Sequence, residues 1–159
     1  MGPGKSYSSS NKFKLSAHCL TKVPLDENKL EGNHLLVKTL LSTTPNNLPL
    51  EVHALIDCGA SGFAFVDEEF AHQQNFPLST LKTPQVVEVI DGRPISSGDI
   101  TQIAKIPMTI GEHKEELPTF VTQLGHYPLV LGIPWLRCHD VSIRFASNTV
   151  TFDSPKCIN

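Results

Sequence analysis

Short apolar runs alternate with clusters of turn-forming residues along most of the chain. This pattern is typical of β-strands rather than of long amphipathic helices. Residues 50–57, "LEVHALID", are predicted to form a strand. The apolar face of this predicted strand carries Leu50, Val52, Ala54 and Ile56. Residues 34–41, "HLLVKTLL", also have the composition of a strand, and the turn residues of "TTPNNLP" between the two segments predict a hairpin.

The same reading extends over the rest of the chain. Further strands are predicted at 63–66, 85–90, 95–110, 117–124, 127–132, 141–145 and 149–152. Asp91-Gly92 is a strong signal for a tight hairpin, and residues 111–116, "GEHKEE", are predicted to form another turn.

Only two segments have the features of short helices. Residues 67–75 begin at Asp67, a good N-cap, and residues 133–140 carry Pro134 in the first turn, where a missing N–H costs little. Roughly eight or nine short strands with two short helices predict an all-β or mainly β fold, a small closed barrel.

Composition narrows this picture to one domain. The chain has 159 residues, 40% apolar and 18% charged, which suits one β-rich core. Residues 1–32 are polar and are predicted to form a flexible lead-in. Residues 33–153 are predicted to form the domain, and residues 154–159 a tail.

The net charge of −3, with no basic cluster, argues against nucleic-acid binding. No apolar run approaches the roughly 20 residues of a membrane helix. With no signal-peptide pattern, an intracellular location is expected.

The cysteine pattern predicts neither a metal site nor a cofactor. The four cysteines are Cys19, Cys58, Cys138 and Cys157. None forms a C-x-x-C pair, and the adjacent pairs His18-Cys19 and Cys138-His139 are poorly spaced to share one metal. Reduced, partly buried thiols are the expectation.

The stretch "LIDCGASGF" (55–63) is the main candidate for chemistry. An apolar strand runs into Asp57, glycines let the backbone bend, and small residues leave room above the carboxylate. Such a turn can present a carboxylate for acid/base work on water, which two carboxylates sharing a proton do well. The chain has one such turn, so a dyad needs a second copy on a two-fold axis. An ordinary β-turn containing Asp57 is the structural alternative.

A second motif, "PLVLGIPWLRCHDVSIRF" (128–145), lies about 70 residues downstream. Together the two segments resemble the retropepsin family of aspartic proteases, and within it the gypsy-like LTR retrotransposon branch. The resemblance rests on "DCGA" (57–60), on the apolar pair and glycine of 130–132, and on Pro-Trp-Leu (134–136). It covers about residues 33–153.

The resemblance implies a homodimeric aspartic endopeptidase that cleaves an extended peptide or a Gag-Pol polyprotein without a cofactor. Asp57 would be the catalytic residue of each subunit. The active-site turn would be completed by Cys58, Gly59 and Ala60. The supporting second motif would comprise Val130, Leu131 and Gly132. The flap that covers the substrate would comprise Val89, Ile90, Asp91, Gly92, Arg93, Pro94 and Ile95.

Cys58 departs from the family pattern, which usually has serine or threonine at this position. A thiol is a weaker hydrogen-bond donor than a hydroxyl, so the contact across the dimer axis is expected to be weaker. The departure leaves open an inactive or host-recruited module that dimerises or binds peptides.

Cys58 and Ser61 are the alternative nucleophiles near this turn. Cys58 would need a nearby base such as His53, His72 or His139, and Ser61 lacks the second glycine of a Gly-x-Ser-x-Gly elbow. Most histidines are expected at exposed positions, and Trp135 in the core.

Overall fold

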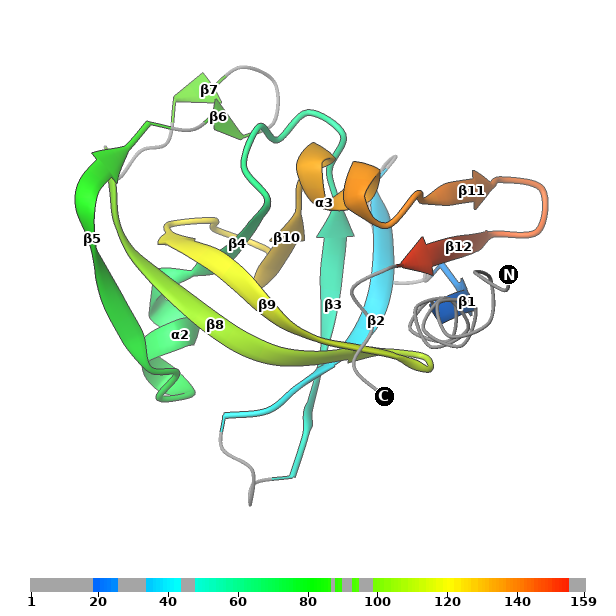
Figure 1. Cartoon of the computed structure of the whole chain (residues 1–159), viewed down its shortest axis with the longest axis horizontal. Helices are drawn as coiled ribbons and strands as arrows, with labels where there is room; N and C mark the ends of the chain where they lie inside the picture. Colours follow the sequence, from blue (N-terminus) through cyan, green and yellow to red (C-terminus); the bar gives the residue numbers. More distant parts are fainter. Residues whose placement is uncertain are drawn as a thin grey trace, which may run out of the picture.

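The computed structural model describes residues 19–25, 34–43, 48–86, 88–89, 93–94 and 99–154. Over these residues the chain is mainly β, with two short helices (Figure 1). The strands are β1 (Cys19–Pro24), β2 (Leu35–Leu41), β3 (Leu50–Ile56), β4 (Ala64–Asp67), β5 (Leu78–Gln85), β6 (Glu88–Val89), β7 (Arg93–Pro94), β8 (Ile100–Ile110), β9 (His113–Thr122), β10 (Leu129–Leu131), β11 (Ser142–Arg144) and β12 (Thr149–Ser154). The helices are α2 (Glu68–Gln73) and α3 (Ile133–Cys138).

Six strands close into a barrel in the order β2-β3-β10-β4-β9-β8. Closure comes from β8 returning to β2, where Leu40 pairs with Thr109 and Leu41 with Met108. Strand β5 continues the sheet beyond β8. A closed sheet leaves no unpaired strand edge within the ring. The predicted small closed barrel is confirmed.

Several local predictions are also confirmed. Strands β2 and β3 form the expected antiparallel hairpin. Asp67 caps α2, because its Oδ2 accepts a hydrogen bond from Phe70 N at 3.2 Å. The other carboxylate oxygen, Oδ1, accepts from Leu124 N at 2.9 Å, which ties the helix start to the end of β9. Helix α3 begins after Gly132, with proline in its first turn.

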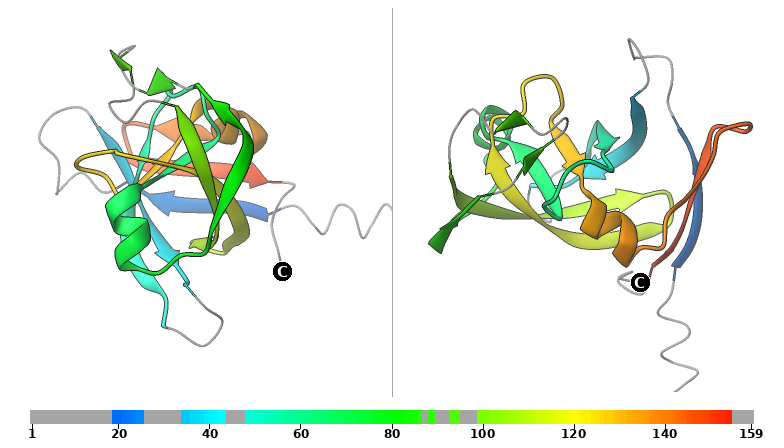
Figure 2. Two further views of the ribbon diagram at one scale, coloured as in Figure 1. Left: turned by 90° about the vertical axis from the view of Figure 1, so that its left-hand side faces the viewer. Right: turned by 90° about the horizontal axis from the view of Figure 1, so that it is seen from above.

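A second, three-stranded sheet lies beside the barrel in the order β1-β12-β11 (Figure 2). Strand β1 pairs with β12 from Cys19↔Ser154 to Pro24↔Thr149. The sequence placed residues 19–25 in a flexible lead-in, whereas the structure pairs them with the domain. The polarity of β1 hid it, because Leu20 is 73% exposed while Thr21 is buried.

Two sequence predictions in the middle of the chain are wrong. The strand predicted at 85–90 is interrupted at Val86, which lies outside any strand, and residues 87 and 90 lie outside the described residues. The longer strand here is β5, which is mostly exposed and contains Pro84, as sheet-edge strands do. Residues 111–116 are not a long turn. The turn consists of Gly111, at φ +58°, and Glu112, and β9 begins at once with His113.

The buried apolar residues form two clusters. The larger fills the barrel and includes Trp135, Phe152 and Leu131. The smaller includes Leu55, Ala60, Phe65 and Val130. Strands β3 and β10 contribute to both clusters, so both faces of these strands are buried. The residues that follow them are therefore held from two sides.

The predicted flap is described only in part. Strands β6 and β7 pair antiparallel, with Glu88 opposite Pro94 and Val89 opposite Arg93. This pair lies at the same end of the molecule as the turn after β3 (Figures 1 and 2). Of the predicted flap residues, Ile90, Asp91, Gly92 and Ile95 lie outside the described residues.

Candidate active site

Asp57 follows β3 directly and is 8% exposed. Its backbone N–H donates to Leu131 O at 2.9 Å, which continues the pairing between β3 and β10. Its carboxylate Oδ1 accepts from the backbone N–H of Gly59 at 2.9 Å. Oδ2 is buried and has no hydrogen-bond partner among the described residues. A buried carboxylate oxygen without a partner is costly, so this oxygen is available for a ligand, a water or a second carboxyl group.

Residues 57–62 are called the Asp57 turn. The residues that follow β10 hold this turn and Phe63 by backbone hydrogen bonds. Gly132 N donates to Phe63 O at 2.9 Å, and Ile133 N donates to Ala60 O at 3.0 Å. A Cβ added at Gly132 would overlap the carbonyl oxygen of Gly62. Glycine is needed at position 132 because the two backbones come this close.

Strand β10 holds both sides of the turn in register. It pairs parallel with β3, which enters the turn, and antiparallel with β4, which leaves it. Leu131 lies opposite Ile56 on one side and Ala64 on the other. The structure therefore brings the second motif, Val130 to Gly132, against the Asp57 turn.

A buried polar cluster lies against the middle of α3 and the residue that follows the helix. It consists of His113, Glu115, Trp135 and His139, and is called the Glu115 cluster. Glu115 Oε1 accepts from Trp135 Nε1 at 2.7 Å and lies 3.1 Å from Nε2 of each histidine. Glu115 is 6% exposed. The Trp135 and His139 rings stack with centroids 4.1 Å apart.

The cluster determines the charge of Glu115. Burial alone raises the pKa of its carboxyl, but the hydrogen bond from His113, the neighbouring His139 ring and the Trp135 N–H together lower this pKa to about 2. The carboxylate is therefore ionised at neutral pH, although it lies in the interior.

The histidine prediction is wrong at two positions. His34, His72 and His126 are exposed, but His113 and His139 are fully buried. The sequence signal for His113 and Glu115 was alternation. Buried residues recur at every second position of β9, so the pattern of 117–124 continues upstream through "HKEE".

The cysteine-nucleophile alternative gains no support from the geometry. Cys58 is exposed. His139 Nδ1 lies 2.9 Å from Trp135 O, and its Nε2 faces Glu115, so this ring is committed elsewhere. His72 is exposed on α2, and His53 lies within β3.

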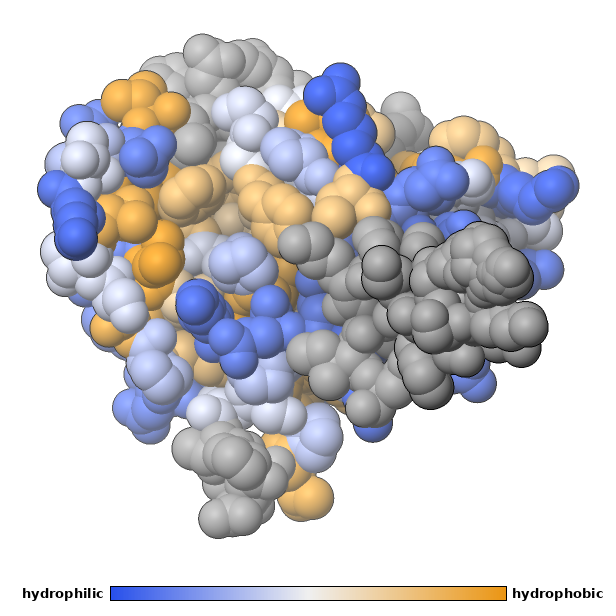
Figure 3. Space-filling model, in the orientation of Figure 1, coloured by the Kyte–Doolittle hydropathy of each residue, from blue (hydrophilic) through white to orange (hydrophobic). Residues whose placement is uncertain are grey.

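A groove of about 350 Å³ opens beside Cys58. It is lined by Cys58, Ile133, Leu136, Arg137, Asp140, Val141 and Ile143. In the space-filling view, apolar residues are exposed across the face on which α3 lies, interrupted by polar side chains (Figure 3). The groove thus places a partly apolar surface next to the Asp57 turn.

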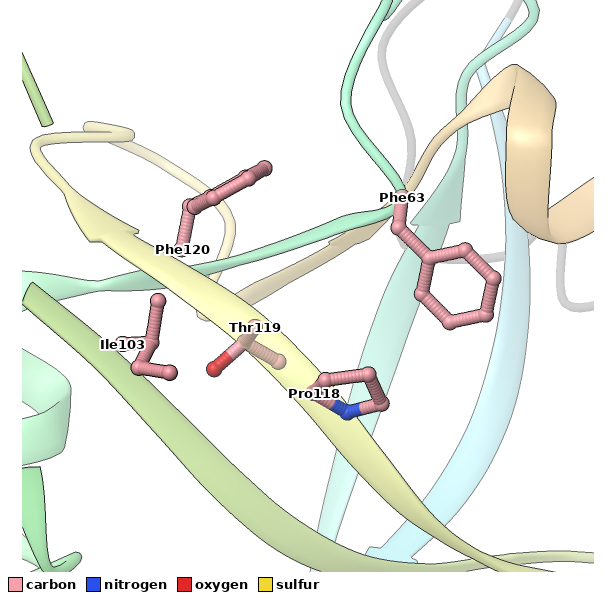
Figure 4. Close-up of a pocket in the computed structure, with 5 residues that line it drawn as sticks. All are labelled: Phe63, Ile103, Pro118, Thr119 and Phe120. Carbon is pink, nitrogen blue, oxygen red and sulfur yellow. The ribbon is translucent and has the colours of Figure 1, made fainter. Parts of the chain in front are cut away.

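A second, smaller pocket of about 80 Å³ lies near Phe63, just after the turn. Phe63 and Pro118 lie at one end, and Ile103 and Phe120 at the other (Figure 4). Thr119 donates its hydroxyl to Ala104 O at 2.8 Å, so the pocket offers an apolar lining. Its size suits only a small apolar group.

No helix within the described residues is both long and apolar enough to cross a membrane.

The comparisons with known proteins agree with this geometry. The family model described as "PEG10/RTL1 protease domain" matches residues 53–159. Among solved structures, a retropepsin-like aspartic protease from Rickettsia conorii matches with a TM-score of 0.52 at 15% identity, over 86% of this chain and 94% of that one. The retroviral protease-like domain of Ddi1 from Leishmania major matches with a TM-score of 0.49 at 16% identity, over 79% of this chain and 92% of that one. The chain belongs to the PEG10/RTL1 protease domain family and has the fold of retropepsin-like aspartic proteases.

Proposed function

We propose that the chain is a homodimeric aspartic endopeptidase in which each of two copies contributes Asp57. The observation that carries this proposal is the Asp57 carboxylate, buried at the end of β3, held through one oxygen by Gly59 and unpartnered at the other among the described residues. The family match and the fold support it. Because the chain has one such turn, the second carboxylate must come from a second copy.

In the proposed reaction the two carboxyl groups share one proton, because like charges this close do not both ionise. The ionised carboxylate takes a proton from water as the water oxygen attacks the peptide carbonyl carbon. The other carboxyl gives its proton to the carbonyl oxygen. The tetrahedral intermediate then collapses. One of its two hydroxyls returns a proton to the ionised carboxylate as the carbonyl re-forms, the C–N bond breaks, and the leaving nitrogen takes the proton of the other carboxyl, so the dyad again holds one proton. The Gly59 N–H keeps Oδ1 oriented through these steps.

The groove beside Cys58 is the surface that we assign to the second copy. It adjoins the Asp57 turn, and its lining is largely apolar, with Ile133, Leu136, Val141 and Ile143. Two residues beyond Ile143, Phe145 is 69% exposed. A second copy placed here would bury this surface and bring the two turns together across the axis. Cys58 would then replace the usual hydroxyl at the contact.

We assign substrate covering to the hairpin of β6 and β7, with Val89, Arg93 and Pro94 among its described residues. An extended peptide would add to it as a further strand by main-chain hydrogen bonds, while apolar side chains set specificity. A polyprotein of a retroelement, of the gypsy-like kind, is the substrate that we propose, processed inside the cell.

The test is cleavage of the precursor polyprotein and of an apolar-rich peptide library between about pH 4 and 7. Wild type, Asp57→Asn and Glu116→Gln are compared, because Glu116 is an exposed carboxylate on β9. Sedimentation gives the oligomeric state of each. Cleavage by the wild type and Glu116→Gln, but not by Asp57→Asn, is the expected result. Equal cleavage by Asp57→Asn would contradict the proposal.

The second candidate function is a host-recruited or inactive module that dimerises or binds peptides. Cys58 favours it, because a weaker contact across the axis leaves the dyad less firmly assembled. A folded dimer that binds peptides without cleaving them would establish this alternative.

A further inference from the structure

The Glu115 cluster lies outside the Asp57 turn, and the proposed chemistry does not use it. We propose that Glu115 is a positioning residue for the Asp57 turn, acting through helix α3. This inference rests on the proposed function for its catalytic consequence, but its structural part can be tested without any activity.

The hydrogen-bond partners of the histidine ring nitrogens show which of these nitrogens carry a proton. His139 Nδ1 lies 2.9 Å from the Trp135 carbonyl oxygen, which only accepts, so this nitrogen carries a proton. Glu115 Oε1 accepts from Trp135 Nε1 at 2.7 Å and from His113 Nε2 at 3.1 Å, so His113 carries a proton on Nε2. The Nε2 atom of His139 lies 3.1 Å from the same oxygen without a hydrogen bond, and the His139 ring stacks on Trp135.

A metal ion is the competing explanation, because ligand atoms of His113, Glu115 and His139 lie within 4.8 Å of one another. The Trp135 N–H and the His113 Nε2–H already donate to Oε1, at 2.7 and 3.1 Å. These two hydrogen bonds account for the carboxylate oxygen that a metal would need. We therefore treat the cluster as hydrogen-bonded, and the metal content of the purified protein tests this.

The connection to the active site runs along α3. At one end of the helix, Ile133 N is bonded to the carbonyl oxygen of Ala60, within the Asp57 turn, and Gly132 N to that of Phe63, the residue after the turn. Two residues further on, the Trp135 N–H is bonded to Glu115 on β9. A helix of six residues fixed at both places has little freedom to shift or roll. Glu115 thus fixes α3 to the barrel wall, and α3 fixes the Asp57 turn.

The first experiment measures amide hydrogen exchange of Gly132 and Ile133 by NMR in the wild type and in Glu115→Gln. Glu116→Gln is the matched control, one residue along β9 and exposed. Trp135→Phe is the second variant, because it keeps an aromatic ring but removes the N–H. We expect exchange at the two amides to rise about tenfold or more in both cluster variants, and to stay unchanged in the control.

The second experiment measures kcat and KM for a cleaved peptide. A displaced turn lowers kcat, because small misplacements of a catalytic group are expensive, so about a tenfold loss with KM unchanged is expected in Glu115→Gln and Trp135→Phe. If the wild type cleaves nothing but the two amides still exchange faster in the variants, the proposed function fails and the positioning role stands.

Three results would overturn the inference. One is unchanged exchange at both amides in folded variants. Another is exchange that rises equally over the whole domain, because this would mean that Glu115 contributes only to global stability. The last is one tightly held zinc ion per chain in protein purified without a histidine tag, lost in Glu115→Gln, because a metal would then replace the hydrogen bonds to Glu115.

Discussion

Replacing Glu115 by glutamine tests whether its buried charge stabilises the fold. The carboxyl has a pKa of about 2 in the folded chain, against 4.5 for an unperturbed glutamate. A carboxyl with a lowered folded pKa contributes stability that is fully present above 4.5 and is lost as the pH falls through 2. The gap between wild type and Glu115→Gln should therefore be constant near neutral pH and should narrow in acid.

The magnitude follows from the same pKa. Each unit of pKa is worth about 1.4 kcal/mol, so the fall from 4.5 to about 2 corresponds to a contribution of about 3 kcal/mol at pH 6 to 7. At pH 3 the unfolded chain is largely protonated at this position and the folded chain is not. The contribution is then about 1.4 kcal/mol, roughly half of the neutral value.

The assay is urea unfolding at pH 7, 5, 4 and 3 at one fixed protein concentration, because self-association would add to the apparent stability. The single tryptophan, Trp135, is fully buried and reports unfolding by fluorescence, while circular dichroism serves as a second probe. Glu116→Gln should match the wild type within about 0.5 kcal/mol at each pH. A gap that is below about 1 kcal/mol at pH 7, or that stays the same down to pH 3, would refute the assignment of a buried ionised carboxylate.

Three further predictions follow from the packing. Gly132→Ala should abolish cleavage and lower the melting temperature, because the new Cβ meets the backbone of the Asp57 turn; thermal melting and peptide hydrolysis check this. Phe152→Ala should destabilise the fold by about 3–5 kcal/mol, while Phe145→Ala, at an exposed position, should change unfolding in urea by less than about 0.5 kcal/mol. Arg137→Glu, an exposed change in the groove assigned to the second copy, should weaken self-association by about tenfold or more in sedimentation without affecting the melting of the monomer.

Part of the barrel was predictable because several of its strands carry local patterns of apolar residues and turn formers. The β2–β3 hairpin and the start of α2 at Asp67 could be placed from local patterns, since alternation and capping are local properties. Closure by β2 and β8 follows from long-range pairing, and the sequence predicts it only through the fold class.

The wrong predictions for β1, β5 and residues 111–116 share a physical cause. In each, polar residues lie where burial or strand pairing depends on partners that are distant in the sequence. Strand β1 buries Thr21 and exposes Leu20, and β5 lies at a sheet edge where polar residues are tolerated. The "HKEE" run reads as a turn, yet His113 and Glu115 face inward because Trp135 and His139 supply partners from α3 and the residue after it. No local pattern shows a partner that lies 20 or more residues away.

The candidate site itself could be proposed from the sequence because its backbone requirements leave residue-type signatures. Gly59 brings an amide to the Asp57 carboxylate, and Gly132 lets α3 start against the turn. The contact between α3 and β9 leaves no such signature. It needs only a charged group and hydrogen-bond donors that meet in space, and these can come from different residue types at different spacings. An apolar contact could fill the same volume, but it would not fix the direction of the Trp135 N–H. The ionised Glu115 does fix this direction, and the orientation of the Asp57 turn therefore depends on a residue that lies on a different strand of the barrel.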